Sequence, residues 1–318
     1  MRLFPSERKY LEILRILKEF REPMGAKRLS EILAKRGFVL TDRAVQYYLR
    51  YLDEMGFTHK VGNTGRVLTR EGISEIESAL VGDRIGFIIS RLERLAFRST
   101  FDPVTGTGDV AYNLSIVPEE EADRAVRAFE RVARAGYGFF SSCRILDGDP
   151  RVPEGKVGII SLCSITIDGV FQRAGIPVVM AYGGRIGIGA GKVDGFLDLI
   201  GYRGTTVDPL QLFVSAGLTS IRGVVETGTG VAVANVREVP LPALGRVREL
   251  LAQMGEWGFT PPAGMGNQVF NLAYSPHHIS IVSFSGMNMV GYGVEEGFHI
   301  RTEIGAGNIP FSKMQGTA

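Results

Sequence analysis

Apolar residues in the first 80 positions recur every three or four residues, which is the period of helices that pack together. The pattern predicts one helix over about 6–22, a second over about 26–36 and a third that begins after Thr41. In the first helix the apolar side chains stand at i, i+3, i+4 and i+7. They are Ile13, Ile16, Leu17 and Phe20.

The third predicted helix has two chemically different faces. Thr41 is expected to cap its first turn. Its apolar face holds Val45, Tyr48, Leu49 and Leu52. Its opposite face holds Arg43, Gln46, Tyr47 and Arg50. Arginine and glutamine can bond the edges of guanine and adenine in the major groove, so this face is a candidate DNA reader. The alternative is an ordinary solvated helix face.

A predicted β-hairpin follows the three helices. Two short strands, about 57–61 and 66–69, flank the turn-prone segment Gly62–Gly65. Lys60 and Arg66 lie on its flanks, where they could meet phosphates or the minor groove. Three helices and a hairpin together predict a winged helix-turn-helix DNA-binding domain over residues 1–80.

The chain after residue 80 contains an internal repeat. The nonapeptide TGTGDVAYN at Thr105–Asn113 returns as TGTGVAVAN at Thr227–Asn235, 122 residues later. The same offset relates further positions across some seventy residues, including Ser161 to Ser283. The alignment then slips by six, since Ile188–Gly191 resembles Ile304–Gly307 at an offset of 116. We therefore expect two copies of one module, at about 82–204 and 205–318.

Each copy predicts a mixture of strands and one long helix. The first strand is expected at about 108–117, and the long helix at about 118–135, with its twin at 241–257. A strongly apolar strand is expected at 156–167 and another strand at 177–181, while 81–97 predicts a leading helix. The fold class is thus α+β: a winged helix followed by a duplicated α/β regulatory domain with mixed or antiparallel sheets.

Charge and cysteine content narrow the function. Residues 1–80 hold 15 Lys and Arg against 11 Asp and Glu, although the whole chain carries only +2, so the basic charge is concentrated in the predicted DNA-binding part. The two cysteines, Cys143 and Cys163, have no CxxC spacing, which fits a reducing compartment. No long apolar run occurs, so we expect a soluble cytoplasmic protein without membrane contact.

No set of residues predicts catalysis, a metal site or a cofactor. The glycine-rich stretch Gly183–Lys192 lacks the spacing of a phosphate-binding loop, and Val193 stands where Ser or Thr is required. The four histidines show no metal-ligand spacing. The chain is therefore predicted not to be an enzyme. Two alternatives stay open: a metabolite-processing enzyme with a DNA-binding head, and a dimerising regulator without a ligand.

One stretch of the repeat predicts a pocket for a small ligand. In Cys163–Gly169 small polar side chains alternate with apolar ones, as on a strand with one face toward a cleft. The glycine-rich loop Gly204–Thr206 precedes a helix start at Asp208–Pro209, and such a loop suits an anion. The alternative is a polar strand face that only makes hydrogen bonds within the fold.

The sequence resembles the archaeal NrpR-type nitrogen-regulatory repressors over essentially its whole length. Six motifs carry the resemblance. They are Cys163–Gly169, Gly175–Val178, Gly204–Pro209, Gly217–Ser220, Thr227–Gly230 and Arg237–Pro240. The resemblance implies a homodimeric repressor of nitrogen-assimilation genes that binds a palindromic operator and is released by 2-oxoglutarate.

With that effector in mind, we expect 2-oxoglutarate to bind between the two halves of the body, with its carboxylates on backbone N–H groups and an arginine. The candidate side chains come from the two pocket segments and from two possible arginines. They are Cys163, Ser164, Thr166, Gly204, Thr205, Thr206, Arg185 and Arg222.

Overall fold

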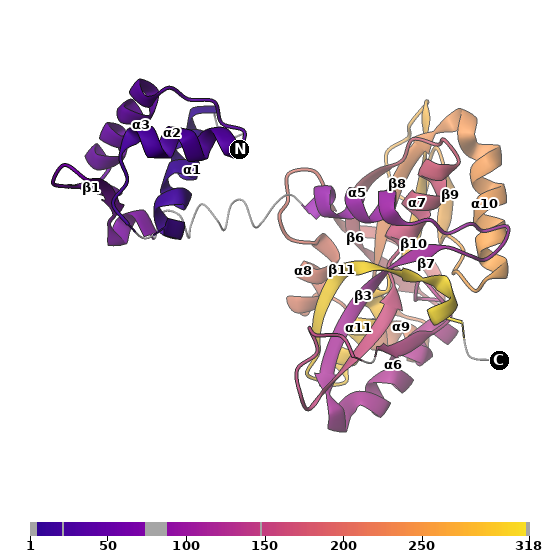
Figure 1. Cartoon of the computed structure of the whole chain (residues 1–318). Helices are drawn as coiled ribbons and strands as arrows, with labels where there is room; N and C mark the ends of the chain where they lie inside the picture. Colours follow the sequence, from indigo (N-terminus) through magenta and orange to yellow (C-terminus); the bar gives the residue numbers. More distant parts are fainter. Residues whose placement is uncertain (1–4, 21, 74–87, 147, 316–318) are drawn as a thin grey trace. The chain divides into compact units, whose positions relative to one another are not determined.

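The computed structural model describes residues 5–20, 22–73, 88–146 and 148–315. The chain divides into two compact units, Met1–Gly86 and Phe87–Ala318 (Figure 1). The predicted boundary at residue 80 lies outside the described residues, as does most of the connecting segment between the units.

The first unit is the predicted winged helix. Its helices are α1 (Pro5–Phe20), α2 (Ala26–Lys35) and α3 (Asp42–Glu54), and its hairpin pairs β1 (Thr58–Val61) with β2 (Gly65–Leu68). The predicted apolar faces form one buried core, in which Ile13, Leu33 and Leu49 are fully buried. The Thr41 hydroxyl accepts a bond from the Ala44 N–H at 3.2 Å, so the predicted cap of α3 is confirmed.

The second unit begins with α5 (Ile88–Arg98), whose apolar face is buried, and continues through two antiparallel sheets. The four-stranded sheet has the order β11-β3-β5-β4 and the five-stranded sheet has the order β7-β6-β8-β10-β9. The elements of the first repeat are β3 (Asp109–Pro118), η1 (Glu119–Glu121), α6 (Ala122–Arg134), β4 (Cys143–Leu146), β5 (Lys156–Leu162), α7 (Ile165–Arg173), β6 (Val179–Gly189) and β7 (Lys192–Gly201). Those of the second are α8 (Pro209–Ser215), α9 (Ile221–Thr227), β8 (Gly230–Pro240), η2 (Leu241–Ala243), α10 (Leu244–Glu256), β9 (Gly264–Gly266), β10 (His278–Phe284), α11 (Met287–Glu295), β11 (Arg301–Pro310) and η3 (Phe311–Lys313).

The offset of 122 residues holds along the whole length of the two repeats. It superposes the starts of α6 and α10, β5 and β10, α7 and α11, and finally β6 at Val179 and β11 at Arg301. The expected slip of six residues is therefore wrong. Glycine-rich segments match one another in several registers, and the match between 188–191 and 304–307 is one of these accidental registers.

The repeats do not form one sheet each, because they exchange the equivalent strands β6 and β11. Strand β6 of the first repeat pairs with β8 of the second, with Gly183 opposite Asn235. Strand β11 of the second repeat pairs with β3 of the first, with Gly307 opposite Tyr112. The helices pack crosswise as well, α6 on α11 and α10 on α7. Each sheet therefore contains strands from both repeats, and the space between the repeats lies inside the second unit.

The expectation of a strand over Cys163–Gly169 is wrong. Strand β5 ends at Leu162, and α7 begins at Ile165. All residues from Ile165 to Phe171 are buried, so the segment is helical without a polar face. A helix that is buried on every side shows no 3.6-residue apolar period, and its β-branched residues favour the strand interpretation. The twin segment is likewise the buried helix α11.

The repeated Thr-Gly-Thr-Gly turn has a structural role. Its glycines have positive φ in both copies: 65° and 102° at Gly106 and Gly108, and 72° and 156° at Gly228 and Gly230. A Cβ at Gly108 would lie 2.3 Å from the Thr100 carbonyl oxygen. Glycine is needed here for its backbone conformation and for the close approach of another chain segment.

Candidate functional site

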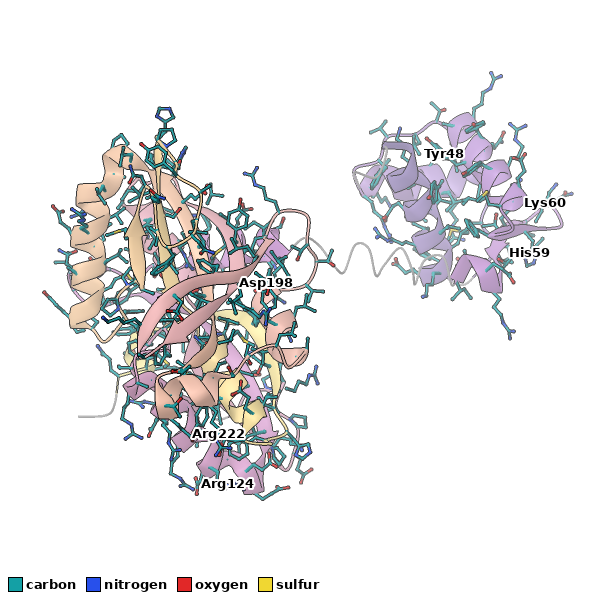
Figure 2. The ribbon with its side chains drawn as sticks, turned by 180° about the vertical axis from the view of Figure 1, so that it is seen from behind. Tyr48, His59, Lys60, Arg124, Asp198 and Arg222 are labelled. Carbon is teal, nitrogen blue, oxygen red and sulfur yellow. The ribbon has the colours of Figure 1, made fainter. Side chains whose placement is uncertain are left out.

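The side chains predicted to read DNA lie exposed on the outer face of α3. Arg43, Gln46, Tyr47 and Arg50 are all exposed, and Tyr47 is 64% exposed. Lys60 on β1 is also exposed, and Figure 2 shows it beside His59 on the wing. These five side chains stay candidates for DNA contact.

Arg66, the sixth predicted DNA contact, is already engaged within the unit. Its Nε donates to Asp53 Oδ2 at 2.7 Å, and its side chain is only 18% exposed. The other oxygen of Asp53 accepts from the Thr58 hydroxyl at 2.6 Å. Arg66 therefore ties the wing to the end of α3 and holds both elements in place, while Lys60 points outward.

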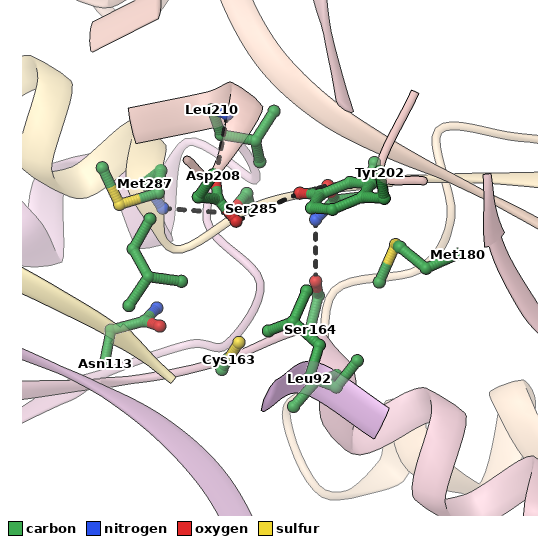
Figure 3. A pocket seen from close by; sticks show the side chains of 13 residues that line it. Leu92, Asn113, Cys163, Ser164, Met180, Tyr202, Asp208, Leu210, Ser285 and Met287 are labelled. Atoms are coloured by element: carbon green, nitrogen blue, oxygen red, sulfur yellow. Dashed lines mark hydrogen bonds between the residues drawn. The ribbon is translucent and has the colours of Figure 1, made fainter. Parts of the chain in front are cut away.

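A small pocket lies between the two repeats of the second unit (Figure 3). Three pairs of its lining residues are twins at the 122-residue offset: Asn113 with Asn235, Cys163 with Ser285, and Ile165 with Met287. Both repeats thus contribute the same positions to it, so the pocket lies where the internal symmetry of the fold places the two copies face to face. We call it the central pocket.

The polar side of the central pocket is a continuous hydrogen-bond network. The Ser164 hydroxyl accepts from Asn235 Nδ2 and from one terminal nitrogen of Arg237, each at 2.9 Å. The Tyr202 hydroxyl lies 2.8 Å from Asn235 Oδ1 and 3.3 Å from a carboxylate oxygen of Asp208. Buried polar groups that are partnered in this way fix one another's orientation.

Arg237 and Asp168 form a fully buried ion pair behind this network. Their side chains are 0% and 4% exposed, and Arg237 Nε donates to Asp168 Oδ2 at 2.7 Å. Arg237 Nη1 has no hydrogen-bond partner among the described residues. The twin positions are Ser115 and Val290, so the ion pair exists on one side of the internal symmetry only.

Burial controls the protonation of the groups around the central pocket. Desolvation raises the pKa of Asp208, although N–H groups of Gln211 and Leu210 at the start of α8 counteract it. Desolvation likewise raises the pKa of Asp168 despite its partner, and that of Cys163 to about 11. The Cys163 thiol is therefore neutral near pH 7, which does not suit a nucleophile.

Two of the predicted effector residues, Cys163 and Ser164, line the central pocket. Thr166 is fully buried below them, and its hydroxyl is used within the fold. It donates to the Cys163 carbonyl at 3.0 Å and accepts from the Ala111 N–H at 3.1 Å. Thr166 therefore positions the segment that carries Cys163 and Ser164.

The predicted anion loop does not reach the central pocket. Gly204 and Thr206 are exposed and Thr205 is half-buried, in the connection between β7 and α8. The start of α8 offers no open N–H groups, because the Asp208 carboxylate already accepts from Leu210 and Gln211. The side chain that caps a helix start here takes the place that an anion would occupy.

The two candidate arginines, Arg185 and Arg222, are also placed elsewhere. Arg185 on β6 is paired with Asp198 on β7 and donates to the Leu218 carbonyl. Arg222 on α9 is paired with Glu226 and Glu296. Figure 2 shows Asp198 and Arg222 on the outside of the unit. Neither arginine lines the central pocket.

The buried charged residues of the site were not predicted from the sequence. Arg237 stands on β8 at a fully buried position, where a charge must have a partner. Asp168 stands in the buried helix α7 in the same way. A charged residue inside an apolar segment was the available signal, and Asn235 ends the repeated nonapeptide itself.

The central pocket is narrow in this structure. It offers about 10 Å³ of free space, which is roughly the room for one water molecule. A metabolite with two carboxylates needs a larger space, so its binding requires side chains or whole repeats to move apart. Among the described residues there is no group of three or more potential metal ligands, and no helix long and apolar enough to cross a membrane.

Comparison with known proteins agrees with the fold. Residues 85–316 match the model for NrpR regulatory domains NRD1 and 2, and residues 11–76 match a winged-helix domain described for ribonuclease R. A solved structure of a nitrogen repressor-like protein from Methanococcus jannaschii superposes with a TM-score of 0.60 at 23% identity, over 72% of this chain and 97% of that one. The predicted fold class is confirmed.

Two relatives are similar over most of this chain. The global nitrogen regulator NrpRI of Methanosarcina mazei is 42% identical over 255 residues, which cover 79% of either chain. The global nitrogen regulator NrpR of Methanocaldococcus jannaschii is 33% identical over 77% of this chain, but the match covers only 43% of that protein. The resemblance seen in the sequence is thereby confirmed, and the chain belongs to the NrpR family of nitrogen regulators.

Proposed function

We propose that this chain is a ligand-responsive transcriptional repressor of nitrogen-assimilation genes, which binds palindromic operator DNA as a cytoplasmic homodimer and is released by 2-oxoglutarate. The names of its relatives support the nitrogen genes, and the winged helix supports DNA as the partner. The single observation that carries the effector site is a pocket between the repeats whose lining residue Ser164 accepts from the buried Arg237, an arginine with a further donor that has no partner among the described residues.

In this proposal α3 enters the major groove and the wing follows the backbone. Arg43, Gln46 and Arg50 are exposed on α3 and can reach base edges, while Lys60 meets a phosphate. Arg66 acts indirectly, since its bond to Asp53 fixes the angle between the wing and α3.

The donors around the central pocket suit a carboxylate ligand. Arg237 Nη1 is unpartnered, and Ser164 and Asn235 carry further hydrogens that a ligand could accept. The Tyr202 hydroxyl could turn its one hydrogen from Asn235 to the ligand. One carboxylate of 2-oxoglutarate would share or replace Asp168 as the partner of Arg237. A bidentate arginine–carboxylate pair is among the strong charge-assisted hydrogen bonds.

Release from DNA follows from the narrowness of the pocket. A ligand that needs more room binds better to a form in which the repeats stand apart, and it shifts the population toward that form. In a dimer the two winged helices must match half-sites roughly 34–36 Å apart, so a change in repeat packing that alters their spacing lowers operator affinity. The ratio of the ligand's affinities for the two forms sets how far operator affinity can fall.

Fluorescence anisotropy with a palindromic promoter fragment tests the proposal. Saturating 2-oxoglutarate should weaken operator binding at least tenfold, and succinate, which lacks the keto group, serves as the ligand control. If DNA binding is unchanged by 2-oxoglutarate, the effector assignment is wrong. The narrow pocket favours a ligand-free dimerising regulator as the second candidate, and that result would select it.

A further inference from the structure

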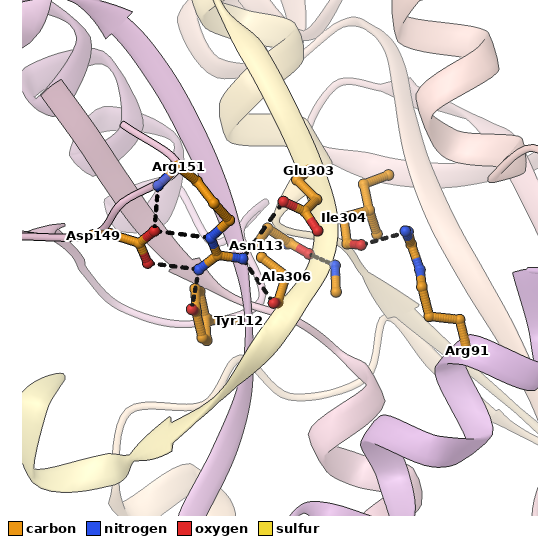
Figure 4. Close-up of polar contacts among 9 residues, drawn as sticks. Arg91, Tyr112, Asn113, Asp149, Arg151, Glu303, Ile304 and Ala306 are labelled. Atoms are coloured by element: carbon orange, nitrogen blue, oxygen red, sulfur yellow. Dashed lines mark hydrogen bonds and ion pairs between the residues drawn. The ribbon is translucent and has the colours of Figure 1, made fainter. Parts of the chain in front are cut away.

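A second cavity lies next to the central pocket. Figure 4 shows the polar contacts of three residues that line it, Arg91, Arg151 and Glu303. This arginine cleft is an open hollow with about 380 Å³ of free space. Ile304 lines both cavities, so the two are neighbours with one side chain as their common wall. Three arginines line the cleft from three separate segments. They are Arg91 on α5, Arg151 between β4 and β5, and Arg301 on β11.

Arg151 forms a fixed wall of the arginine cleft. Its guanidinium bonds both oxygens of Asp149, at 2.9 and 2.7 Å, the Tyr112 hydroxyl at 2.6 Å and the Ala306 carbonyl at 2.9 Å. Glu303 lies 3.5 Å away from it. All its donors are engaged, so Arg151 gives the cleft a rigid edge and a charge that Asp149 largely neutralises.

Arg91 and Arg301 are the free cations of the arginine cleft. Neither makes an ion pair with any residue that the structure describes. Arg91 donates to the Ile304 carbonyl at 2.6 Å, which fixes its position, yet its Nε is buried and has no partner among those residues. A buried donor without an acceptor is unfavourable, so a rotation of the Arg91 guanidinium that brings its Nε to an oxyanion in the cleft would supply the missing acceptor.

The fold itself does not require these charges. At the 122-residue offset the twins of Arg91, Arg151 and Arg301 are Phe213, Ala273 and Val179. The second half of the unit therefore builds the same elements with uncharged residues at all three positions. Because a purely structural role would apply to both copies, the asymmetry favours a role in binding.

We propose that the arginine cleft is a binding site for a small oxyanion, a metabolite that carries carboxylate or phosphate groups, separate from the central pocket. Arg91 and Arg301 bind the charged groups from two sides, and Arg151 with Gln211 borders the space. A small anion of several charges fits this set better than a single carboxylate, because the two free cations come from different elements.

Isothermal titration calorimetry on the full chain at low ionic strength tests the site, with pyrophosphate and citrate as separate probes. We expect one anion per chain for at least one probe, and the probe that binds tells phosphate from carboxylate ligands. The exposed Arg301→Gln variant should weaken binding at least tenfold, and Arg91→Lys should weaken it as well. Arg248→Gln, the same change at an exposed arginine on α10, should stay within twofold of the wild type.

Three results would overturn the proposal. The first is no heat with either probe. The second is an equal loss of binding in Arg301→Gln and Arg248→Gln, which would mean non-specific attraction to surface charge. The third is competition between 2-oxoglutarate and the bound probe, because the cleft would then be the effector site. A failure of 2-oxoglutarate to bind, with the probe still bound, would affect only the proposed effector.

Discussion

Removing one partner of the buried pair between Arg237 and Asp168 should strongly destabilise the second unit. Asp168→Asn removes the negative charge and leaves the guanidinium buried without a counter-charge, with only the Ser164 hydroxyl and the neutral amide oxygen as side-chain acceptors. Breaking a buried ion pair in this way costs about 3–5 kcal/mol. Arg237→Met leaves the Asp168 carboxylate buried without its cation and should cost a similar amount.

Removing both charges together should cost far less. Replacing a buried ion pair by apolar residues of similar volume is often neutral or stabilising. In Asp168→Leu with Arg237→Met the Ser164 hydroxyl loses one donor, at a cost of about 1 kcal/mol, but it keeps Asn235. The double variant should therefore lose less free energy of unfolding than the two single variants lose in sum, by about 3 kcal/mol or more.

The single tryptophan of the chain makes the assay specific to the second unit. Trp257 follows α10, and its indole N–H donates to the Pro103 carbonyl at 2.9 Å. Guanidinium denaturation followed by Trp257 fluorescence therefore reports the unfolding of this unit. Single variants that each lose less than about 1 kcal/mol, or a double variant whose loss is additive, would refute the reasoning that the pair is buried and mutually dependent.

Three further predictions concern the DNA contacts and the protonation of individual groups. Lys60→Ala should weaken DNA binding for all sequences alike and reduce the salt slope by about 1, measured by anisotropy across salt concentrations; an unchanged slope would remove Lys60 from the interface. The hydrogen bonds from Arg151 lower the pKa of Asp149 to about 2, so the stability that this contact contributes is present above the ordinary carboxyl pKa and is lost as the pH falls toward 2; Asp149→Asn should abolish that part of the acid dependence in thermal melts, and an unaltered acid profile would contradict it. Burial raises the pKa of Cys143 to about 12 and of Cys163 to about 11, so neither thiol should react with a disulfide reagent at pH 8 before unfolding, and fast labelling of the native chain would speak against their burial.

The winged helix was predictable because its helices are short, amphipathic and half exposed. Their apolar period and the Thr41 cap are local features of the sequence. The internal repeat was predictable for the same reason, since identical residues return at a constant offset. The ends of the long helices were also predictable from the local sequence. Gly136 and Gly258 follow these helices with φ values of 80° and 92°, which favour glycine.

The pairing of the strands was not predictable from such signals. Strands β6 and β11 carry no local mark that tells which repeat they will join, since either choice satisfies their pattern. The same limit hid the buried polar residues behind the central pocket. Arg237, Asp168 and Asn235 come together only because the strand exchange brings β8 of one repeat beside α7 of the other. Arg185 and Arg222 were plausible by sequence, but nearby carboxylates already neutralise them.

Calorimetric titration of the full chain with 2-oxoglutarate tests the central claim most directly, that the space between the repeats holds the effector. The wild type and Cys163→Ser, a change of similar size at the pocket wall, should bind one ligand per chain with similar affinity. Cys163→Leu should weaken binding at least tenfold by filling the pocket, while Trp257 fluorescence reports whether the variant is still folded. No heat with the wild type, or undiminished binding by folded Cys163→Leu, would contradict the account.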